Sequence, residues 1–209
     1  PGQKGIILWN GQEEILLLST DIRTSQPSYL LEVIPMPSEP KVELGDFATF
    51  QKMQRLLIDK TMWRVASGGG VPGAEAPASA AQVTFHQQMG AHDVTVVNVL
   101  DQARFVDWVN VYFAEKKAEN PKVDPKFAAV IQNYLDRGTQ WFVFDSLRVD
   151  ETLQSKQPIA YRFKTGSVYY PLEISSRETG KTLVDLVIVT PTPLGKLPKY
   201  QFAVRRESD

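Results

Sequence analysis

The first forty residues constrain the fold most, because two apolar runs are separated there by an Asn-Gly pair. Residues 4–9 and 12–20 are rich in Ile, Leu and Trp, and Asn10 and Gly11 lie between them. Asn-Gly accepts positive φ at both central positions of a type I′ turn, which matches the twist of two paired strands. The sequence therefore predicts an antiparallel hairpin at the start of the chain.

The second arm of this hairpin is apolar on both faces. Ile15 and Leu17 share one face of the strand, and Leu16 and Leu18 share the other. A strand of this kind is covered on both sides, so we expect it to lie inside a sheet and not at an edge. A third strand is expected at residues 29–34, before a proline-rich segment that favours extended backbone.

Each of three predicted helices begins after an aspartate that can cap its N-terminus. Asp46 precedes a helix at residues 47–61, and Asp101 precedes the second helix. Asp124 precedes the third, with Pro125 at the first helical position, where proline is favoured. In all three segments apolar side chains recur three or four residues apart, which is the pattern of an amphipathic helix.

Much of the remaining chain alternates between apolar and polar residues, as strands do. Further strands are expected around the last two helices, at residues 83–86, 93–99, 141–144, 159–164, 168–174, 183–190 and 200–204. Because the gaps between them are short, the sequence predicts a single α+β domain over residues 1–209, with a mixed, mainly antiparallel β-sheet system and about three α-helices. The side chains predicted to form the core are Trp9, Leu17, Phe105, Ile131, Tyr134, Phe144, Phe163 and Leu186.

Composition excludes several classes of function. Hydrophobic residues make up 43% of the chain and charged residues 22%, which is ordinary for a soluble globular protein. Lys and Arg number 23 and Asp and Glu 24, so nothing in the net charge of −1 favours nucleic acid or an anionic membrane surface. No apolar run approaches the ~18 residues of a membrane span. The absence of cysteine excludes disulfides, thiolate metal sites and cysteine nucleophiles.

The one candidate constellation for metal chemistry is His86, His92 and Asp93 in the segment FHQQMGAHD. Imidazole is the side chain that titrates near neutrality, and both histidines of the chain lie in this segment. If the two flanking strands pair, the rings approach each other, and Asp93 or Glu75 would complete a zinc-like set. The alternative interpretation is that both are ordinary histidines at strand ends.

No other catalytic pattern is present. Gly68-Gly69-Gly70 is not followed by the Gly-Lys-Ser/Thr of a phosphate-binding loop, and no G-x-S-x-G motif supports a nucleophilic serine. We therefore assign no catalytic residue and expect no cofactor.

Several short motifs, taken in order, resemble a known family. They are QKGIILWNGQEEILLLSTDI, VIPMPSEPKV, GAHDVTVVNV, NYLDRG before WFVF, and VYYPLEISS. Over residues 3–191 the chain is similar to the domain of unknown function 2330 family of predicted exported proteins of bacteria and archaea. The resemblance implies an extracytoplasmic protein, commonly made with a signal peptide and sometimes tethered at a terminus. It implies no reaction and supplies no catalytic residues.

Three classes of function follow from these observations. The first is a non-catalytic extracytoplasmic binding or assembly module of the cell envelope, with protein partners there, no nucleic acid, no membrane span within this chain and a possible membrane tether outside it. The second is an enzyme of unrecognised type, and the third is a metal-binding exported protein that uses His86 and His92. The chain starts at Pro1 without methionine, for which removal of a signal peptide is one natural reason. We therefore expect it to be secreted, periplasmic or on the cell surface.

Residues 67–81, SGGGVPGAEAPASAA, carry no apolar periodicity. Such a segment buries too little apolar surface to offset the entropy lost on ordering. The sequence therefore predicts a flexible Gly/Ala/Pro-rich loop within the single domain.

Deletion of residues 68–78 is expected to change the free energy of unfolding by no more than about 0.5 kcal/mol, because an exposed linker makes few native contacts. Thermal denaturation followed by circular dichroism measures this change. Unfolding of the variant would show that the small residues pack in the core. Loss of a partner complex at unchanged stability would show that the loop is itself the contact.

Overall fold

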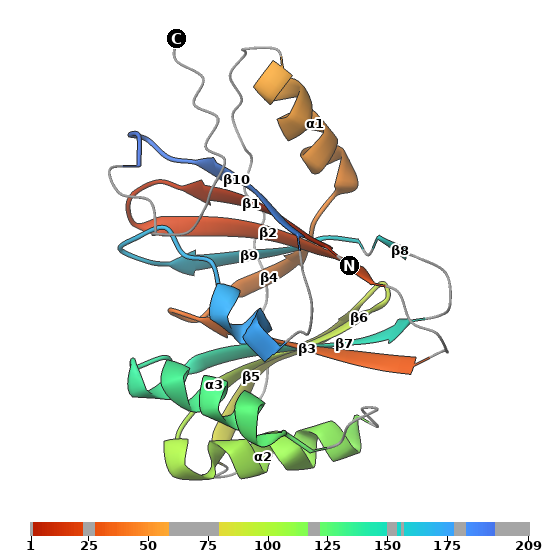
Figure 1. The fold of residues 1–209 in the computed structure, drawn as a ribbon, viewed down its shortest axis with the longest axis vertical. Coiled ribbons are helices and arrows are strands. Elements are labelled where there is room, and N and C mark those ends of the chain that lie inside the picture. Colours follow the sequence, from red (N-terminus) through yellow and green to blue (C-terminus); the bar gives the residue numbers. More distant parts are fainter. Residues whose placement is uncertain are drawn as a thin grey trace.

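The chain forms two β-sheets stacked face to face, and helices α2 (Gln102–Glu115) and α3 (Pro125–Asp136) cover the far side of one of them (Figure 1). The computed structural model describes residues 2–22, 28–58, 80–116, 122–149, 154–155, 157–177 and 183–194. Three helices and two mainly antiparallel sheets confirm the predicted α+β class. The last predicted strand, residues 200–204, and residues 67–79 of the predicted loop lie outside the described residues.

The first sheet, called the hairpin sheet, has the strand order β10-β1-β2-β9-β4, and β8 pairs with β2. The predicted hairpin is formed by β1 (Gly2–Trp9) and β2 (Glu13–Ile22), with Gly11 at a φ of 102° between them. The Asn10 N–H donates to the Glu13 carbonyl, so the turn is centred on Gly11 and Gln12 and not, as predicted, on Asn10 and Gly11. The Asn10 side-chain oxygen accepts the N–H groups of Gln12 and Glu13 and so closes the turn. As predicted, β2 lies inside the sheet. The other strands are β4 (Lys41–Leu44), β8 (Gln154–Ser155), β9 (Ile159–Lys164) and β10 (Leu183–Val189).

The edge strand β10 pairs with β1 in parallel, and every other strand pair described is antiparallel. Gly5 allows the two strands to approach, because a Cβ at this position would lie 2.7 Å from the Leu186 Cδ2 atom. This one parallel pair makes the sheet system mixed, as predicted.

The second sheet, called the helix-covered sheet, has the antiparallel order β3-β7-β6-β5. Asp101 and Asp124 cap α2 and α3 as predicted, by accepting the N–H groups of Arg104 and Phe127. The first helix, α1, lies instead on the outer side of the hairpin sheet (Figure 1). The bounds are β3 (Ser28–Met36), β5 (Ala81–Met89), β6 (His92–Val99), β7 (Trp141–Val149), α1 (Phe47–Ile58), α2 (Gln102–Glu115) and α3 (Pro125–Asp136).

Two apolar layers hold these elements together. One lies between the helix-covered sheet and α2 and α3, where Phe144 contacts the rings of Phe105 and Tyr112. The other, called the inter-sheet layer, joins side chains from before and after residues 67–81. Six of the eight predicted core residues are buried, while Trp9 and Leu186 are half-buried. The largest members of the inter-sheet layer are Ile7, Leu16, Met36, Tyr161 and Phe163.

The prediction of a strand at residues 168–174 was wrong. Instead, the chain leaves the sheet after β9 and forms the short 3-10 helix η1 (Leu172–Arg177). Pro171 has no N–H to donate to a ladder, and the Leu172 N–H donates to the Tyr170 carbonyl within the turn. The predicted loop also ended one residue too late, because β5 begins at Ala81. No helix in the described ranges is both long and apolar enough to span a bilayer.

Candidate functional site

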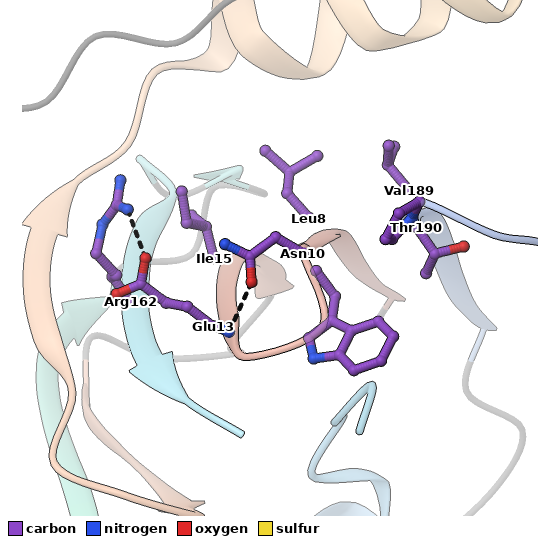
Figure 2. Close-up of a pocket in the computed structure, with 9 residues that line it drawn as sticks. Leu8, Asn10, Glu13, Ile15, Arg162, Val189 and Thr190 are labelled. Carbon is purple, nitrogen blue, oxygen red and sulfur yellow. Dashed lines mark hydrogen bonds and ion pairs between the residues drawn. The ribbon is translucent and has the colours of Figure 1, made fainter. Parts of the chain in front are cut away.

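An open, mainly apolar groove of about 400 Å³ lies on the outer face of the hairpin sheet. Its floor is formed by Leu8, Ile15 and Val189, which are neighbours in register on β1, β2 and β10. Because Ile7 points into the inter-sheet layer, Leu8 points to the opposite side. Figure 2 shows the three floor side chains pointing the same way, to the side on which α1 lies.

One end of the groove carries an ion pair. The Arg162 guanidinium donates to the Glu13 carboxylate at 3.0 Å, and both side chains remain more than a third exposed. Such a solvated pair contributes at most about 1 kcal/mol to stability. The groove therefore offers a ligand an apolar floor with one weakly held pair of opposite charges beside it (Figure 2).

Strand β10 bounds the groove on the other side and is the outermost strand of the hairpin sheet among the described residues. Its side chains are unusually apolar for such a position: Leu183 is 75% exposed and Val189 is 43% exposed. Edge strands are ordinarily protected against pairing by charged residues, proline or a bulge. The strand LVDLVIV has Asp185 as its only charged residue.

The two histidines occupy different environments. His92 lies at the start of β6, 3% exposed, with its Nδ1 atom 2.6 Å from the Asp145 Oδ2 atom. Its Nε2 atom is 2.9 Å from the Gln157 carbonyl oxygen. Gln157 lies two residues before the start of β9 at Ile159. Each ring nitrogen therefore lies within hydrogen-bond distance of an oxygen atom. The pair of His92 and Asp145 lies within the helix-covered sheet, and the contact of His92 with Gln157 links it to the approach to β9 of the hairpin sheet.

His86 is exposed and belongs to a surface cluster. Its Nε2 atom is 2.6 Å from one oxygen of Asp93, and the Lys116 ammonium donates to the other oxygen at 2.6 Å. Burial would raise the pKa of the Asp93 carboxyl, but the hydrogen bonds from Lys116 and His86 outweigh it and hold that pKa below its usual value. Asp93 is therefore an ionised carboxylate that is held by Lys116 and His86.

The three residues predicted as metal ligands do not converge. His86 and Asp93 meet on one face of the β5–β6 hairpin, while His92 points to the other face with both nitrogens engaged. No group of three or more His, Cys, Asp or Glu side chains within the described residues could hold a metal ion. Glu75 lies outside those residues. The metal site at His86, His92 and Asp93 stays a prediction, and the described geometry gives it no support.

Two buried carboxyl groups were missed by sequence reasoning: Asp145 and Glu14. Glu14 is fully buried, its Oε2 atom accepts the Tyr169 N–H at 2.8 Å, and its Oε1 atom has no partner in the described structure. Burial raises the pKa of Glu14 to about 7, although the hydrogen bond from Tyr169 lowers it. The alternation of residues along β2 could have predicted the burial of Glu14, because Glu14 shares the inward face of this strand with Leu16.

Comparison with known proteins identifies the family. The family model described as "Uncharacterized protein conserved in bacteria (DUF2330)" matches residues 2–192. The chain belongs to this family. The resemblance expected from the motifs is thereby confirmed. No curated protein matches the chain.

Among solved structures, the chain is similar to a mutated baculovirus P35 after caspase cleavage, at 12% sequence identity and a TM-score of 0.40. The match covers 78% of this chain and 55% of that one, so the chain spans about half the length of that protein.

We expect His92 and Asp145 to stabilise the protein only when both are present. Replacing His92 with Leu removes the ring that hydrogen-bonds the buried Asp145 carboxyl, which should cost about 2–3 kcal/mol. Asp145→Leu should cost a similar amount, while the double variant should recover at least half of the summed loss. Urea denaturation of all four proteins measures the coupling.

The matched control is His86→Ala, which removes the exposed histidine from its pair with Asp93. This change should cost less than about 1 kcal/mol, because exposed ion pairs are weak. Equal losses for His92→Leu and His86→Ala would contradict the assigned role of the buried pair.

Proposed function

We propose that the chain is a non-catalytic binding or assembly module of the cell envelope, located outside the cytoplasm, which binds an extended segment of a protein partner along β10. One observation carries the proposal. In the described structure, the free edge of β10 combines exposed apolar side chains with an adjoining apolar groove. The extracytoplasmic setting is supported by the resemblance to predicted exported proteins.

The geometry of a strand edge selects the class of partner. An edge presents N–H and C=O groups at strand spacing, and another extended backbone satisfies such a row. Alternate side chains of an added strand would lie on the groove side, next to Val187 and Val189. Leu8 lies one strand further in, within reach of a long apolar side chain. We therefore expect the partner to supply an extended segment with apolar residues at every second position.

The enzyme alternative has one observation in its favour. A carboxyl group with a pKa of about 7, as Glu14 has, could serve as a general acid or base near neutrality. However, Glu14 is fully buried and does not line the groove. A substrate in the groove would not touch it, so the binding module is the function that the geometry favours.

Random nine-residue peptides displayed on phage are a suitable probe for the β10 edge. A selected peptide is synthesised in two forms, N-methylated at either the odd or the even backbone amides. Because alternate amides of an added strand face its neighbour, one form should lose at least tenfold in affinity and the other should bind nearly as well as the parent. Isothermal titration calorimetry measures both affinities.

Val189→Lys should also weaken binding at least tenfold, since it places a charge at the edge and on the groove floor. Val111→Lys is the matched control, because Val111 is 59% exposed on α2, away from the hairpin sheet. Equal binding by both N-methylated forms, or an unaffected Val189→Lys variant, would exclude strand addition at β10. Dimerisation of the free chain that Val189→Lys abolishes would assign the edge to a second copy instead.

Localisation is tested separately. Fractionation of cells that express the native gene from its own promoter should place the protein with periplasmic, surface or medium markers. Immunoblotting of each fraction measures its distribution. Recovery with a cytoplasmic marker enzyme would contradict the extracytoplasmic part of the proposal.

A further inference from the structure

Residues 165–177, called the strap, leave the end of β9 and end in η1 beside α3 (Figure 1). The strap is tied to the hairpin sheet at its start, where the Thr165 N–H donates to the Gln12 carbonyl. Its middle contacts both sheets, because Tyr169 donates its N–H to Glu14 on β2 and its hydroxyl to the Pro35 carbonyl on β3. The strap therefore closes one side of the inter-sheet layer.

The far end of the strap is held by polar contacts near the surface. The Tyr170 hydroxyl donates to the Gln3 side-chain oxygen, and Gln3 in turn donates to the Ser175 hydroxyl. The Arg137 guanidinium of α3 forms a 2.7 Å ion pair with Glu173, and both side chains are more than a third exposed. Such contacts are individually weak. Val168, Tyr169 and Tyr170 also pack against the inter-sheet layer, so local opening exposes these side chains, but it breaks no hydrogen bond between paired strands.

Glu14 lies beneath the strap, and no cationic side chain of the described residues pairs with it. Its cross-strand neighbours on the same face are Trp9 and Phe163, which are both uncharged. The ion pair between Glu13 and Arg162 lines the groove on the opposite face of the sheet. In the described structure the Glu14 carboxyl accepts one hydrogen bond, from the Tyr169 N–H. Ionised Glu14 would therefore be a buried carboxylate satisfied by a single neutral donor, which is costly.

We propose that the strap is a pH-dependent latch, which stays closed over Glu14 while that carboxyl is protonated and opens locally when it ionises. Opening lifts Tyr169 away and admits water, which solvates the carboxylate. The latch is independent of the proposed binding at β10, because it needs no partner.

The direction of the pH dependence follows from the pKa of Glu14. Burial raises it to about 7 in the closed state, from 4.5 for an exposed glutamate. The closed state is therefore fully favoured below pH 4.5, loses its advantage between pH 4.5 and about 7, and changes no further above that. The equilibrium between closed and open strap should shift by up to about 300-fold across this range.

The other groups that face the strap are not expected to produce this change. Burial raises the pKa of the hydroxyl groups of Tyr134, Tyr169 and Tyr170, so all three stay protonated across the range. Two further carboxyl groups face the strap: Glu173, which is paired with Arg137, and Glu32 of β3, whose charge adds to burial in raising the pKa of Tyr170. The Glu14→Gln variant retains both, so it separates their effect from that of Glu14. Glu14 is therefore the group to replace in a test.

Native-state hydrogen exchange of the whole chain tests the latch between pH 4.5 and 8. The amide of Tyr169 reports on the strap, because it donates to the Glu14 carboxyl in the closed arrangement and loses this partner on opening. After correction for the intrinsic exchange rate, its protection should fall by up to about 300-fold in the wild type. In the isosteric variant Glu14→Gln it should stay nearly constant, and a folded far-UV circular dichroism spectrum verifies that variant.

Glu13→Gln is the matched control, since it removes the neighbouring carboxyl from the opposite face and should retain the wild-type pH dependence. An unchanged pH dependence in Glu14→Gln would overturn the proposal. So would equal free energies of opening for strap amides and for amides of β6 and β7 at every pH, because the strap would then open only with the whole fold.

Discussion

The two sheets share one apolar layer, and every polar group inside it has to find a partner there. Water does not reach these groups, so an unpaired donor, acceptor or charge costs free energy that the apolar contacts must offset. His92 and Asp145 meet this constraint together, and the Gln157 carbonyl takes the remaining ring nitrogen. Because Gln157 belongs to the approach to β9, the same three groups also fix how the helix-covered sheet sits against the hairpin sheet.

Glu14 meets the same constraint less completely. It lies in the layer as His92 does, but it faces Trp9, Phe163 and a single backbone donor. The difference lies in the partner elements: the partner of Asp145 is His92 on the neighbouring strand β6, whereas the donor to Glu14 comes from the strap. A buried carboxyl that depends on a connecting segment couples its protonation to the position of that segment. The inter-sheet layer thus contains the contacts of His92 with Asp145 and Gln157, and a contact between Glu14 and the strap that depends on the protonation of Glu14.

Local signals predicted the helices and the first hairpin well. Asp101, Asp124 and Pro125 act within one turn of backbone, and Asn10-Gly11 acts within two residues, so no distant partner was needed. The parallel pairing of β1 with β10 could not be predicted in this way, because it joins residues more than 170 positions apart. Residues 168–174 alternate like a strand, yet their aromatic side chains fasten the strap, and Pro171 starts the turn into η1.

In the candidate site, the alternation of side chains along a strand is the sequence signal that was overlooked. His92 and Asp93 are adjacent in a strand, so they point to opposite faces and cannot both meet His86. Alternation along β2 likewise places Glu14 among inward-facing leucines, which marks a buried carboxyl from sequence alone.

Strand β10 is almost entirely apolar although it lies at an edge of the hairpin sheet in the described structure. Its sequence, LVDLVIV, is apolar on both faces except for Asp185, a composition typical of strands that are covered on both faces. Yet within the described part of the chain it has one neighbour, β1. The exposure of Leu183, Ile188 and Val189 follows directly from that position. A second strand beside β10 would give this segment the surroundings that its composition suits, and this is the physical basis for assigning recognition to this edge.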